Sequence, residues 1–372
     1  SPLVVDSNGW MVQFVELSAK DRISFMTKLL DGKRIVVTGG TGSLGKTLVK
    51  RLLSGEHGTP SAVVVFSRDE AKQHDMRMSY LQKRVATEEI TYHNFERTLQ
   101  FVIGDIRDFH SVAQVLVGAD IVVNAAALKQ VPACEYFPYE AVRTNIEGAE
   151  NIVRAIKELR LNIETVVAIS TDKACKPTNV MGMTKAIQER IFLTANIDCP
   201  KTRFVAVRYG NVLASRGSVV PLFLDQIDAG GPITLTDKRM TRFLLTLDQA
   251  VDTVFEAMQF AEAGETYIPK IKAALIVDVV AALIGKNKIE VKETGVRPGE
   301  KLHEVLVSQE ESLRTISRGD YFAIKSVLPE VSKPVVSEHF EFDELSSEHF
   351  LMTTKEVQTF LEKNLSGDLT GH

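Results

Sequence analysis

Residues 36–48 read VVTGGTGSLGKTL, a β-branched run that stops at a glycine and continues into residues suited to a helix. Gly39, Gly42 and Gly45 are spaced three apart, as in the turn that joins the first strand of a parallel sheet to its first helix. Glycine at these positions permits a tight turn and close packing of the helix on the strand. The stretch therefore predicts the beginning of a doubly wound domain.

Apolar runs of the same kind recur along the chain, and segments with helical patterning separate them. Nearly continuous apolarity is typical of strands that are buried on both faces of a parallel sheet. The alternation predicts an α/β fold, a doubly wound parallel (Rossmann) sheet with right-handed crossovers. The expected strands after the first are 62–68, 99–105, 120–126, 165–171 and 203–211, and the expected helices are 43–54, 69–84, 108–117, 139–160 and 180–196.

The composition narrows the class of protein. The 372 residues carry a formal net charge of −4, so neither nucleic acid nor an anionic membrane is expected as a partner. No apolar run approaches the roughly 20 residues that a membrane span needs. The three cysteines, Cys134, Cys175 and Cys199, are scattered, which favours a reducing, cytoplasmic location over a disulfide framework. No histidine has metal-ligand spacing, so no metal is expected.

The glycine-spaced turn also indicates a ligand. Free N–H groups at a helix start donate to an anion, and glycines let the backbone approach a pyrophosphate, so we expect a dinucleotide. Arg68, with Ser67 before it and Lys72 after it, suits a ribose 2′-phosphate and favours NADP over NAD. An inward-turned Asp69 is the alternative that favours NAD. The expected cofactor residues are Gly39, Thr41, Gly42, Ser43, Leu44, Gly45, Ser67, Arg68, Lys72, Asp105, Ile106, Ala125, Ala126, Ala127, Lys129, Thr144, Lys185 and Tyr209.

Changes in the pattern of apolar and polar residues divide the chain into four parts. Residues 1–31 are expected to be an extension with an amphipathic helix, in which Ile23, Met26 and Leu30 share a face. The NADP-binding Rossmann domain is expected over 32–212, with a polar surface excursion at 85–98. A smaller α+β substrate lobe, some of whose strands can return to the core, follows over 213–330. Residues 331–372 form a C-terminal extension that ends in a helix.

The stretch ISTDKACKPTNVMGMTK, residues 169–185, carries the candidate chemistry. Asp172 and Lys173 are adjacent at the end of an expected strand, where parallel sheets place active sites. Met181 precedes Lys185 by four residues, so both lie on one face of the expected helix. A thioether has no acidic proton and is a poor acceptor.

Eight motifs together resemble the extended short-chain dehydrogenase/reductase family. Within it they are most similar to the UDP-N-acetylglucosamine 4,6-dehydratases that invert C5 and serve capsule and surface-polysaccharide synthesis. The resemblance runs from about residue 33 to about residue 325. The motifs are TGGTGSLGK, FSRDEAKQ, GDIRD, NAAALKQVPACEYFPYEAVRTNIEG, ISTDKACKPTNVMGMTK, RYGNVLASRGSVVPLF, MTRFLLTLDQAVD and VRPGEKLHEVL.

The resemblance implies a closed redox cycle. NADP⁺ takes hydride from C4 of the hexose, and the resulting ketone acidifies the C5 proton. A base removes that proton while an acid protonates the C6 hydroxyl, and water leaves. The same NADPH returns hydride to C6, and C5 is reprotonated on the opposite face. The expected product is a 4-keto-6-deoxy sugar nucleotide.

In the family's pattern, Asp172 corresponds to the acid and Lys173 to the base of the elimination. Lys173 must be neutral to act, so its pKa has to fall. Most members carry a Tyr at the place of Met181, and that Tyr removes the C4 hydroxyl proton. Two substitutes for the Tyr stay open: Lys173 acting twice, or a water held by Lys185 and Thr171.

Two other functions stay open. A UDP-hexose 4-epimerase of this fold needs the Tyr twice and does not need the Asp172–Lys173 pair, so the sequence favours elimination. A non-catalytic protein that binds the cofactor and sugar nucleotide is the other alternative. The resemblance also implies a homo-oligomer, with a hexamer as one candidate. The residues that correspond to the family's substrate site are Lys129, Asn211, Val212, Arg216, Arg242, Arg297 and Glu300.

Overall fold

The computed structural model describes residues 28–82, 95, 97–213, 218–296, 298–332 and 340–365. The expected N-terminal helix lies outside these residues except at its end, where Leu30 is fully buried within a turn. Arg216 and Arg297 also lie outside the described residues.

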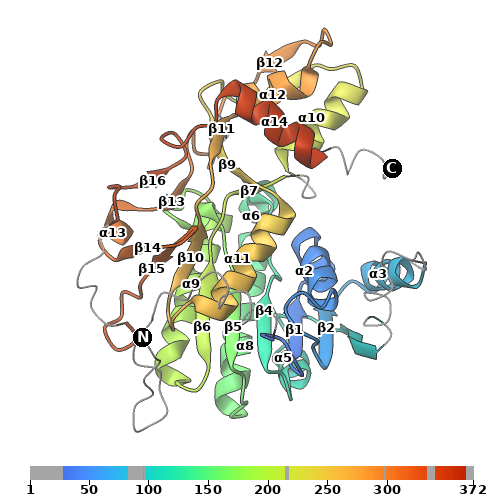
Figure 1. Cartoon of the computed structure of the whole chain (residues 1–372), viewed down its shortest axis with the longest axis vertical. Helices are drawn as coiled ribbons and strands as arrows, with labels where there is room; N and C mark the ends of the chain where they lie inside the picture. The colour runs from blue at the N-terminus through green and yellow to red at the C-terminus, as the bar shows by residue number, and fades with distance from the viewer. Residues whose placement is uncertain are drawn as a thin grey trace.

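A nine-stranded sheet, formed by described residues, is the centre of the molecule (Figure 1). The neighbouring strands β3, β2, β1, β4, β5, β6 and β10, in their order across the sheet, are all parallel. This arrangement confirms the predicted doubly wound fold. Two further strands, β15 and β14, extend the same edge in antiparallel fashion. In spatial order the strands are β14 (Thr315–Arg318), β15 (Tyr321–Ile324), β10 (Thr266–Pro269), β6 (Arg203–Val207), β5 (Thr165–Ile169), β4 (Ile121–Asn124), β1 (Arg34–Thr38), β2 (Ala62–Ser67) and β3 (Leu99–Ile103).

Helices cover both faces of this sheet because successive strand residues point to opposite sides. In β1, Ile35 and Val37 pack into one apolar cluster, whereas Val36 packs into the other. The first cluster includes residues of α2 (Ser43–Leu53), α3 (Glu70–Gln82) and α11 (Leu247–Phe260). The second includes residues of α5 (Phe109–Leu116), α8 (Gly148–Glu158) and α9 (Val180–Asp198).

The connections over the carboxyl edge of the sheet contain short helical elements. Between β4 and α8 these are α6 (Val131–Tyr136), α7 (Pro138–Ala141) and the π-helical turn η2 (Val142–Glu147). The 3₁₀ turn η3 (Asp172–Ala174) follows β5 directly. The helix expected over 139–160 is present, because α7, η2 and α8 follow one another without a break from Pro138 to Glu158. The sequence pattern did not predict its π-helical turn or the separate elements α6 and η3.

The remaining elements build the smaller lobe above the carboxyl edge (Figure 1). The C-terminal helix packs into this lobe, where Val357 and Leu361 join the same apolar cluster as Val279. The lobe comprises β7 (Asn211–Val212), β8 (Ile233–Leu235), β9 (Thr241–Leu245), β11 (Ala273–Leu275), β12 (Val291–Glu293), α10 (Val219–Asp228), α12 (Ile276–Ile284) and α14 (Thr354–Leu365), with β13 (Val305–Val307), α13 (Gln309–Ser312) and β16 (Leu345–Ser346) alongside.

The polar excursion at 85–98 is attached to the main fold at its end. Phe95 is buried and stacks on Tyr80 of α3 with their ring centroids 5.2 Å apart. An aromatic pair of this kind holds the end of the excursion against the helix.

Glycine is required at the first turn of the fold for reasons of space as well as backbone angle. Gly39 has a φ of +66°, and a Cβ added there would lie 2.7 Å from the Cα and N of Ala126. A Cβ added at Gly45 would lie 2.6 Å from backbone atoms of Gly40. The turn therefore packs directly against the backbone that follows β4.

We predict that Gly39→Ala lowers the free energy of unfolding by about 2 kcal/mol or more, through positive φ and overlap combined. Gly55→Ala is the matched control, since Gly55 has a φ of +81° but no atom within 4 Å of the added Cβ. We expect the control to cost about 1 kcal/mol. Urea unfolding followed by circular dichroism measures both, and equal losses would show that the overlap with Ala126 does not matter.

Candidate active site

Two adjoining cavities lie at the carboxyl ends of the parallel strands, where α/β sheets bind ligands. One measures about 690 Å³ and surrounds the glycine turn, and the other measures about 650 Å³ and extends under the lobe. They form one cleft because they share wall residues, namely Ser43, Leu44, Ala125, Ala127, Lys129 and Gln130.

The cavity at the glycine turn contains nearly all the residues predicted to hold the cofactor. Only Lys185 and Tyr209 do not line it, and both line the second cavity. The site fits a dinucleotide at two points: glycine keeps the floor free of a Cβ, and the buried Thr144 hydroxyl has no hydrogen-bond partner among the described residues.

At the end of β2, the charged side chains already have partners. Lys72 pairs with Asp69 at 2.5 Å, and this hydrogen bond holds the pKa of Asp69 below its usual value. The Arg68 side chain is 57% exposed and lies 4.0 Å from Asp105. Asp69 is therefore bonded to Lys72 of its own helix, while the Arg68 guanidinium remains accessible on the cavity wall.

The second cavity contains the residues predicted for the chemistry, with one exception. Asp172 does not line it, because its side chain is fully buried behind the wall. Two of the predicted substrate residues, Asn211 and Glu300, each have a buried oxygen atom without a hydrogen-bond partner in the described part of the chain. The predicted residues on its wall are Lys129, Thr171, Lys173, Met181, Lys185, Tyr209, Asn211, Val212, Arg242 and Glu300.

The loop after β5 fixes the candidate base. The Asp172 N–H donates to the carbonyl of Tyr209, which ties this loop to the end of β6. The Thr171 hydroxyl donates to Asp172 Oδ1 at 2.8 Å, and Lys173 Nζ donates to the same oxygen at 3.0 Å. The Lys173 amine is thus held at the cavity wall by a buried carboxylate.

The charge state of Lys173 differs from the one that the sequence required. Burial lowers the pKa of Lys173, but the nearby carboxylates of Asp172 and Glu304 outweigh burial, so its pKa lies above the usual value. Before ligands bind, Lys173 is therefore an ammonium group. The structure does not show the predicted fall in its pKa, which has to come from bound ligands or from proton transfer within the site.

Lys185 has the opposite environment. Its Nζ donates to the carbonyl of Ile169 at 2.5 Å and to the side chain of Gln188. Burial lowers its pKa to about 8. Met181, one turn earlier on α9, lies on the cavity wall with 4% of its surface exposed. Tyr209 also lines the cavity, but burial raises its pKa, which makes its phenolate hard to form.

Arg242 acts on the protein backbone in this structure. Its guanidinium donates to the carbonyls of Thr241, Lys301 and Leu302. The bonds to residues 301 and 302 order the segment that carries the cavity residues Glu300 and Glu304, so in this structure they favour a role for Arg242 in ordering that segment over direct contact with the sugar nucleotide.

Among the cavity residues that sequence reasoning did not name, Glu304 is the one beside the candidate base. Its side chain is 2% exposed, lines the second cavity and lies 3.5 Å from Lys173 Nζ. The motif VRPGEKLHEVL pointed to Glu300 and contained Glu304 as well, but only the fold shows that Glu304 meets the loop after β5.

Comparison with known proteins places the chain in a family. The family model described as "Polysaccharide biosynthesis protein" matches residues 35–326. The chain belongs to this family. The match confirms the resemblance that the eight motifs indicated.

Relatives carry two different names. A Rickettsia bellii protein named UDP-glucose 4-epimerase is 40% identical over 297 residues, covering 78% of this chain and 82% of the relative. A Campylobacter jejuni protein named UDP-N-acetylglucosamine 4,6-dehydratase (inverting) is 39% identical over 299 residues, covering 80% and 84%. The X-ray structure of Pen from Bacillus thuringiensis, 33% identical, superposes with a TM-score of 0.79 and covers 90% of this chain and 98% of Pen.

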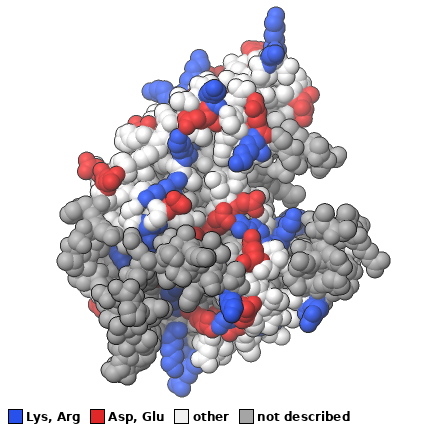
Figure 2. Space-filling view, in the orientation of Figure 1, with Lys and Arg blue, Asp and Glu red and all other residues white. Residues whose placement is uncertain are grey.

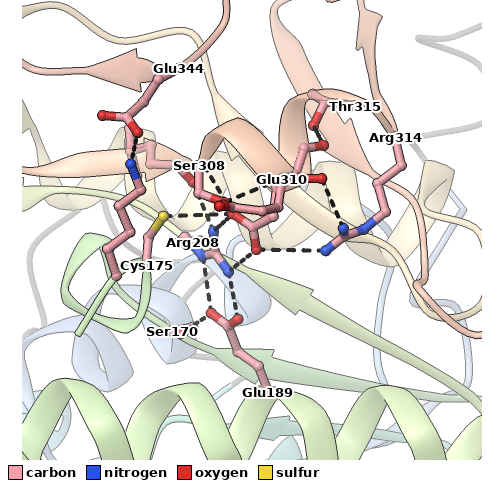
Figure 3. Close-up of polar contacts among 12 residues, drawn as sticks. Ser170, Cys175, Glu189, Arg208, Ser308, Glu310, Arg314, Thr315 and Glu344 are labelled. Atoms are coloured by element: carbon pink, nitrogen blue, oxygen red, sulfur yellow. Dashed lines mark hydrogen bonds and ion pairs between the residues drawn. The ribbon is translucent and has the colours of Figure 1, made fainter.

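Within this family member, a buried ion network supports the loop after β5 from behind (Figure 3). Arg208, at the end of β6, bonds Glu189 of α9 at 2.7 Å and Glu311 of α13 at 2.8 Å. Ser170, immediately before the loop, donates to Glu189, and the thiol of Cys175 lies 3.6 Å from Glu311. The network therefore joins the sheet, the helix that carries Lys185 and the lobe.

The surface carries no large patch of one charge on the face drawn in Figure 2, where acidic and basic side chains intermix over the described residues. Among the described residues, no three histidine, cysteine or acidic side chains gather as metal ligands would. No helix in the described ranges combines the length and apolarity that crossing a bilayer requires.

We predict that Glu311→Gln lowers the free energy of unfolding at pH 7 by about 3 kcal/mol. Burial raises the pKa of Glu311, but Arg208 and hydrogen bonds outweigh burial and lower it to about 2 from 4.5. Because the folded-state pKa is depressed, the stabilisation is complete above the unfolded-state pKa and is lost as pH falls towards 2. The difference from wild type should shrink by about 1 kcal/mol at pH ~3.5.

Glu310→Gln is the control for this prediction, because Glu310 is the exposed neighbour on the same short helix. We expect it to change stability by less than about 0.5 kcal/mol. Urea titrations at both pH values give the comparison. A Glu311→Gln penalty that does not vary with pH would contradict the assigned pKa.

Proposed function

We propose that this protein catalyses the NADP-dependent 4,6-dehydration of UDP-N-acetylglucosamine with inversion at C5, forming a UDP-4-keto-6-deoxy-hexosamine. The observation that carries the proposal is the position of Lys173. Its amine lies on the wall of the second cavity, which shares Ala125, Ala127 and Lys129 with the cavity at the glycine turn. A hexose there is within reach of both a nicotinamide and the Lys173 amine.

The chemistry divides between the cofactor and the side chains. The cofactor, which Gly39, Gly42 and Thr144 would hold in the first cavity, would supply a hydride acceptor for C4 and a hydride donor for C6. Lys173 takes the C5 proton, which the ketone at C4 has acidified, and a carboxyl group beside it protonates the departing C6 hydroxyl. The motif nominates Asp172 as that carboxyl group. Lys129 lies where the two cavities meet, so it is placed to contact the nicotinamide end of the cofactor or the sugar. Burial lowers the pKa of its amine.

Oxidation at C4 also requires a proton acceptor, and Met181 cannot serve. Lys185 supports the proposal because a pKa of about 8 leaves part of its amine neutral near neutral pH. Thr171, which lines the same cavity, is the second group that could hold a water beside it. Lys173 acting twice is the alternative route.

The preference for NADP rests on Arg68. Its exposed guanidinium lines the cavity at the end of β2, and its planar fork suits a 2′-phosphate. Asp69, which would favour NAD, is bonded to Lys72.

We predict that Arg68→Ala raises the Kd for NADP about 10- to 100-fold, the value of one or two charge-assisted hydrogen bonds. The Kd for NAD should change less than about threefold, since NAD lacks the 2′-phosphate. Fluorescence or calorimetric titration of both cofactors provides the internal control. A parallel weakening of both would indicate that Arg68 does not contact the phosphate.

A UDP-hexose 4-epimerase is the second candidate, because a 40% identical relative carries that name. Against it, Met181 removes the Tyr pathway that epimerisation uses twice, and the Asp172–Lys173 pair has no role in it. Incubation with UDP-N-acetylglucosamine in heavy water distinguishes the two candidates.

We predict that the purified protein, incubated with UDP-N-acetylglucosamine in heavy water, releases one water per sugar and incorporates deuterium at C5. Mass spectrometry and NMR record both changes. Unchanged mass with inverted C4 would favour the epimerase, and binding without reaction would favour a non-catalytic protein.

Lys173→Ala should reduce water loss by about 10²- to 10⁴-fold, as expected for removal of a general base. Lys157→Ala is the control, because Lys157 is an exposed lysine of α8 that pairs with Asp198. Full activity of Lys173→Ala would overturn the assignment of the base.

The proposal includes a homo-oligomer. Tyr136, Phe137 and Tyr139 are 83%, 64% and 66% exposed, and Met183 and Ile187 of the adjacent α9 are also exposed. Exposed apolar groups gathered on neighbouring elements mark interaction surfaces. Light scattering on the purified protein measures the assembly directly.

A further inference from the structure

Glu304 is a buried carboxylate that faces the cavity and is surrounded by cations. Lys173 Nζ lies 3.5 Å from Oε1, Arg242 Nε lies 3.9 Å from the same oxygen, and Lys301 Nζ lies 3.8 Å from Oε2. Only Lys173 among these cations carries a proposed role in proton transfer.

The backbone of Glu304 is fixed, so its side chain is preorganised. Its N–H donates to Ser347 Oγ at 2.9 Å, and the Ser347 N–H donates to its carbonyl at 2.8 Å. Its Oε2 is buried and has no hydrogen-bond partner among the described residues. A buried carboxylate oxygen without a donor is costly, which is the pattern expected where a ligand hydroxyl completes the site.

Asp172 differs from Glu304 in access. The Asp172 side chain is wholly buried and does not line the cavity, and its Oδ1 already accepts from Thr171 and Lys173. Its Oδ2, like Glu304 Oε2, has no hydrogen-bond partner among the described residues, so the two carboxylates differ in access to the cavity and not in this respect. A proton donor has to come within hydrogen-bond reach of the leaving oxygen. Of the two carboxylates beside Lys173, Glu304 is the one on the cavity wall.

We propose that Glu304, rather than Asp172, is the general acid that protonates the departing C6 hydroxyl, and that Asp172 positions Lys173. This inference rests on the proposed dehydratase activity. It changes the residue that carries one step and leaves the reaction unchanged.

The proton balance closes within the Lys173–Glu304 pair. Transfer of one proton from the ammonium to the carboxylate, directly or through a substrate hydroxyl, gives a neutral amine and a carboxylic acid with no change in net charge. The amine then takes the C5 proton, and the C5–H electrons form the C5=C6 bond. The C6–O bond breaks, and the oxygen leaves as water with the Glu304 proton. The pair returns to ammonium and carboxylate, as seen in the structure.

The test compares Glu304→Gln with Asp172→Asn in three measurements: reduced-cofactor absorbance in a single turnover, deuterium exchange at C5 in recovered sugar, and water loss. We expect Glu304→Gln to retain the first two, because removing one of the two carboxylates that raise the pKa of Lys173 favours its neutral amine without a transfer to residue 304. Water loss should become about 10²- to 10⁴-fold slower, since the glutamine cannot protonate the leaving oxygen. A 6-deoxy-6-fluoro analogue, whose fluoride leaves without a proton, should restore elimination to within about tenfold of wild type.

Each other outcome has a definite meaning. Water loss by Glu304→Gln within threefold of wild type, or equal losses on both substrates, would overturn the role of Glu304. Rescue of Asp172→Asn alone by the fluoro analogue would return the acid to Asp172. If wild type itself loses no water, the proposed function fails independently of either variant.

Cofactor binding and circular dichroism check that each variant folds. Should Glu304→Gln not fold, Glu304→Asp replaces it, since that variant keeps the charge but withdraws the carboxyl group by one methylene. We then expect at least a tenfold loss with the natural substrate and less than a threefold loss with the fluoro analogue. Equal losses would overturn the proposal.

Discussion

The ion network around Arg208 is the constraint on which the active-site geometry depends. Burial lowers the pKa of this guanidinium, yet Glu189 and Glu311 raise it well above the usual value, so it stays charged. Removing one partner of a buried pair is strongly destabilising, because the remaining charge has no water to solvate it. The three side chains therefore hold β6, α9 and α13 in one relative position. Ser170 and Cys175, on either side of the loop after β5, bond to Glu189 and Glu311 and so fix this loop to the same network.

In this arrangement, two lysines with opposite electrostatic environments line one cavity. Lys173 faces carboxylates and has a raised pKa, whereas Lys185 faces a carbonyl and an amide oxygen and has a lowered one. Hydrogen bonds to neutral acceptors do not compensate burial as a carboxylate does. The same residue type thus has pKa values shifted in opposite directions, on one helix and in the loop beside it.

Local patterns predicted the fold and most of the cleft, because the glycine turn, the strand ends and the loop after β5 act through neighbours in sequence. The residues that were missed act over long separations. Glu304 and Lys173 are far apart in the chain, and so are Arg208 and Glu311. The sequence pattern allowed strands of 213–330 to return to the core, and β10, β15 and β14 do so. It did not identify which segments return, since short strands there carry no pattern that distinguishes the main sheet from the lobe. The motif correctly placed Asp172 in the loop beside the cavity. The burial of its side chain behind the cavity wall depends on packing that no motif encodes.

Met181, at the position where the family's sequence pattern led us to expect a tyrosine, fits its surroundings. A tyrosine beside Lys185 would need its phenolate stabilised by an ammonium, and burial weakens that support by lowering the pKa of Lys185 to about 8. Methionine instead completes a small apolar cluster with Cys134 and Ala141. That cluster supplies no acceptor to Lys185, whose Nζ donates to the Ile169 carbonyl and the Gln188 side chain instead. The absence of a phenol and the lowered pKa of Lys185 therefore belong to one apolar environment. Under the proposed dehydratase activity, the proton acceptor at C4 then has to be a water held by Lys185 and Thr171 or the Lys173 amine, because these residues line the same cavity as Met181.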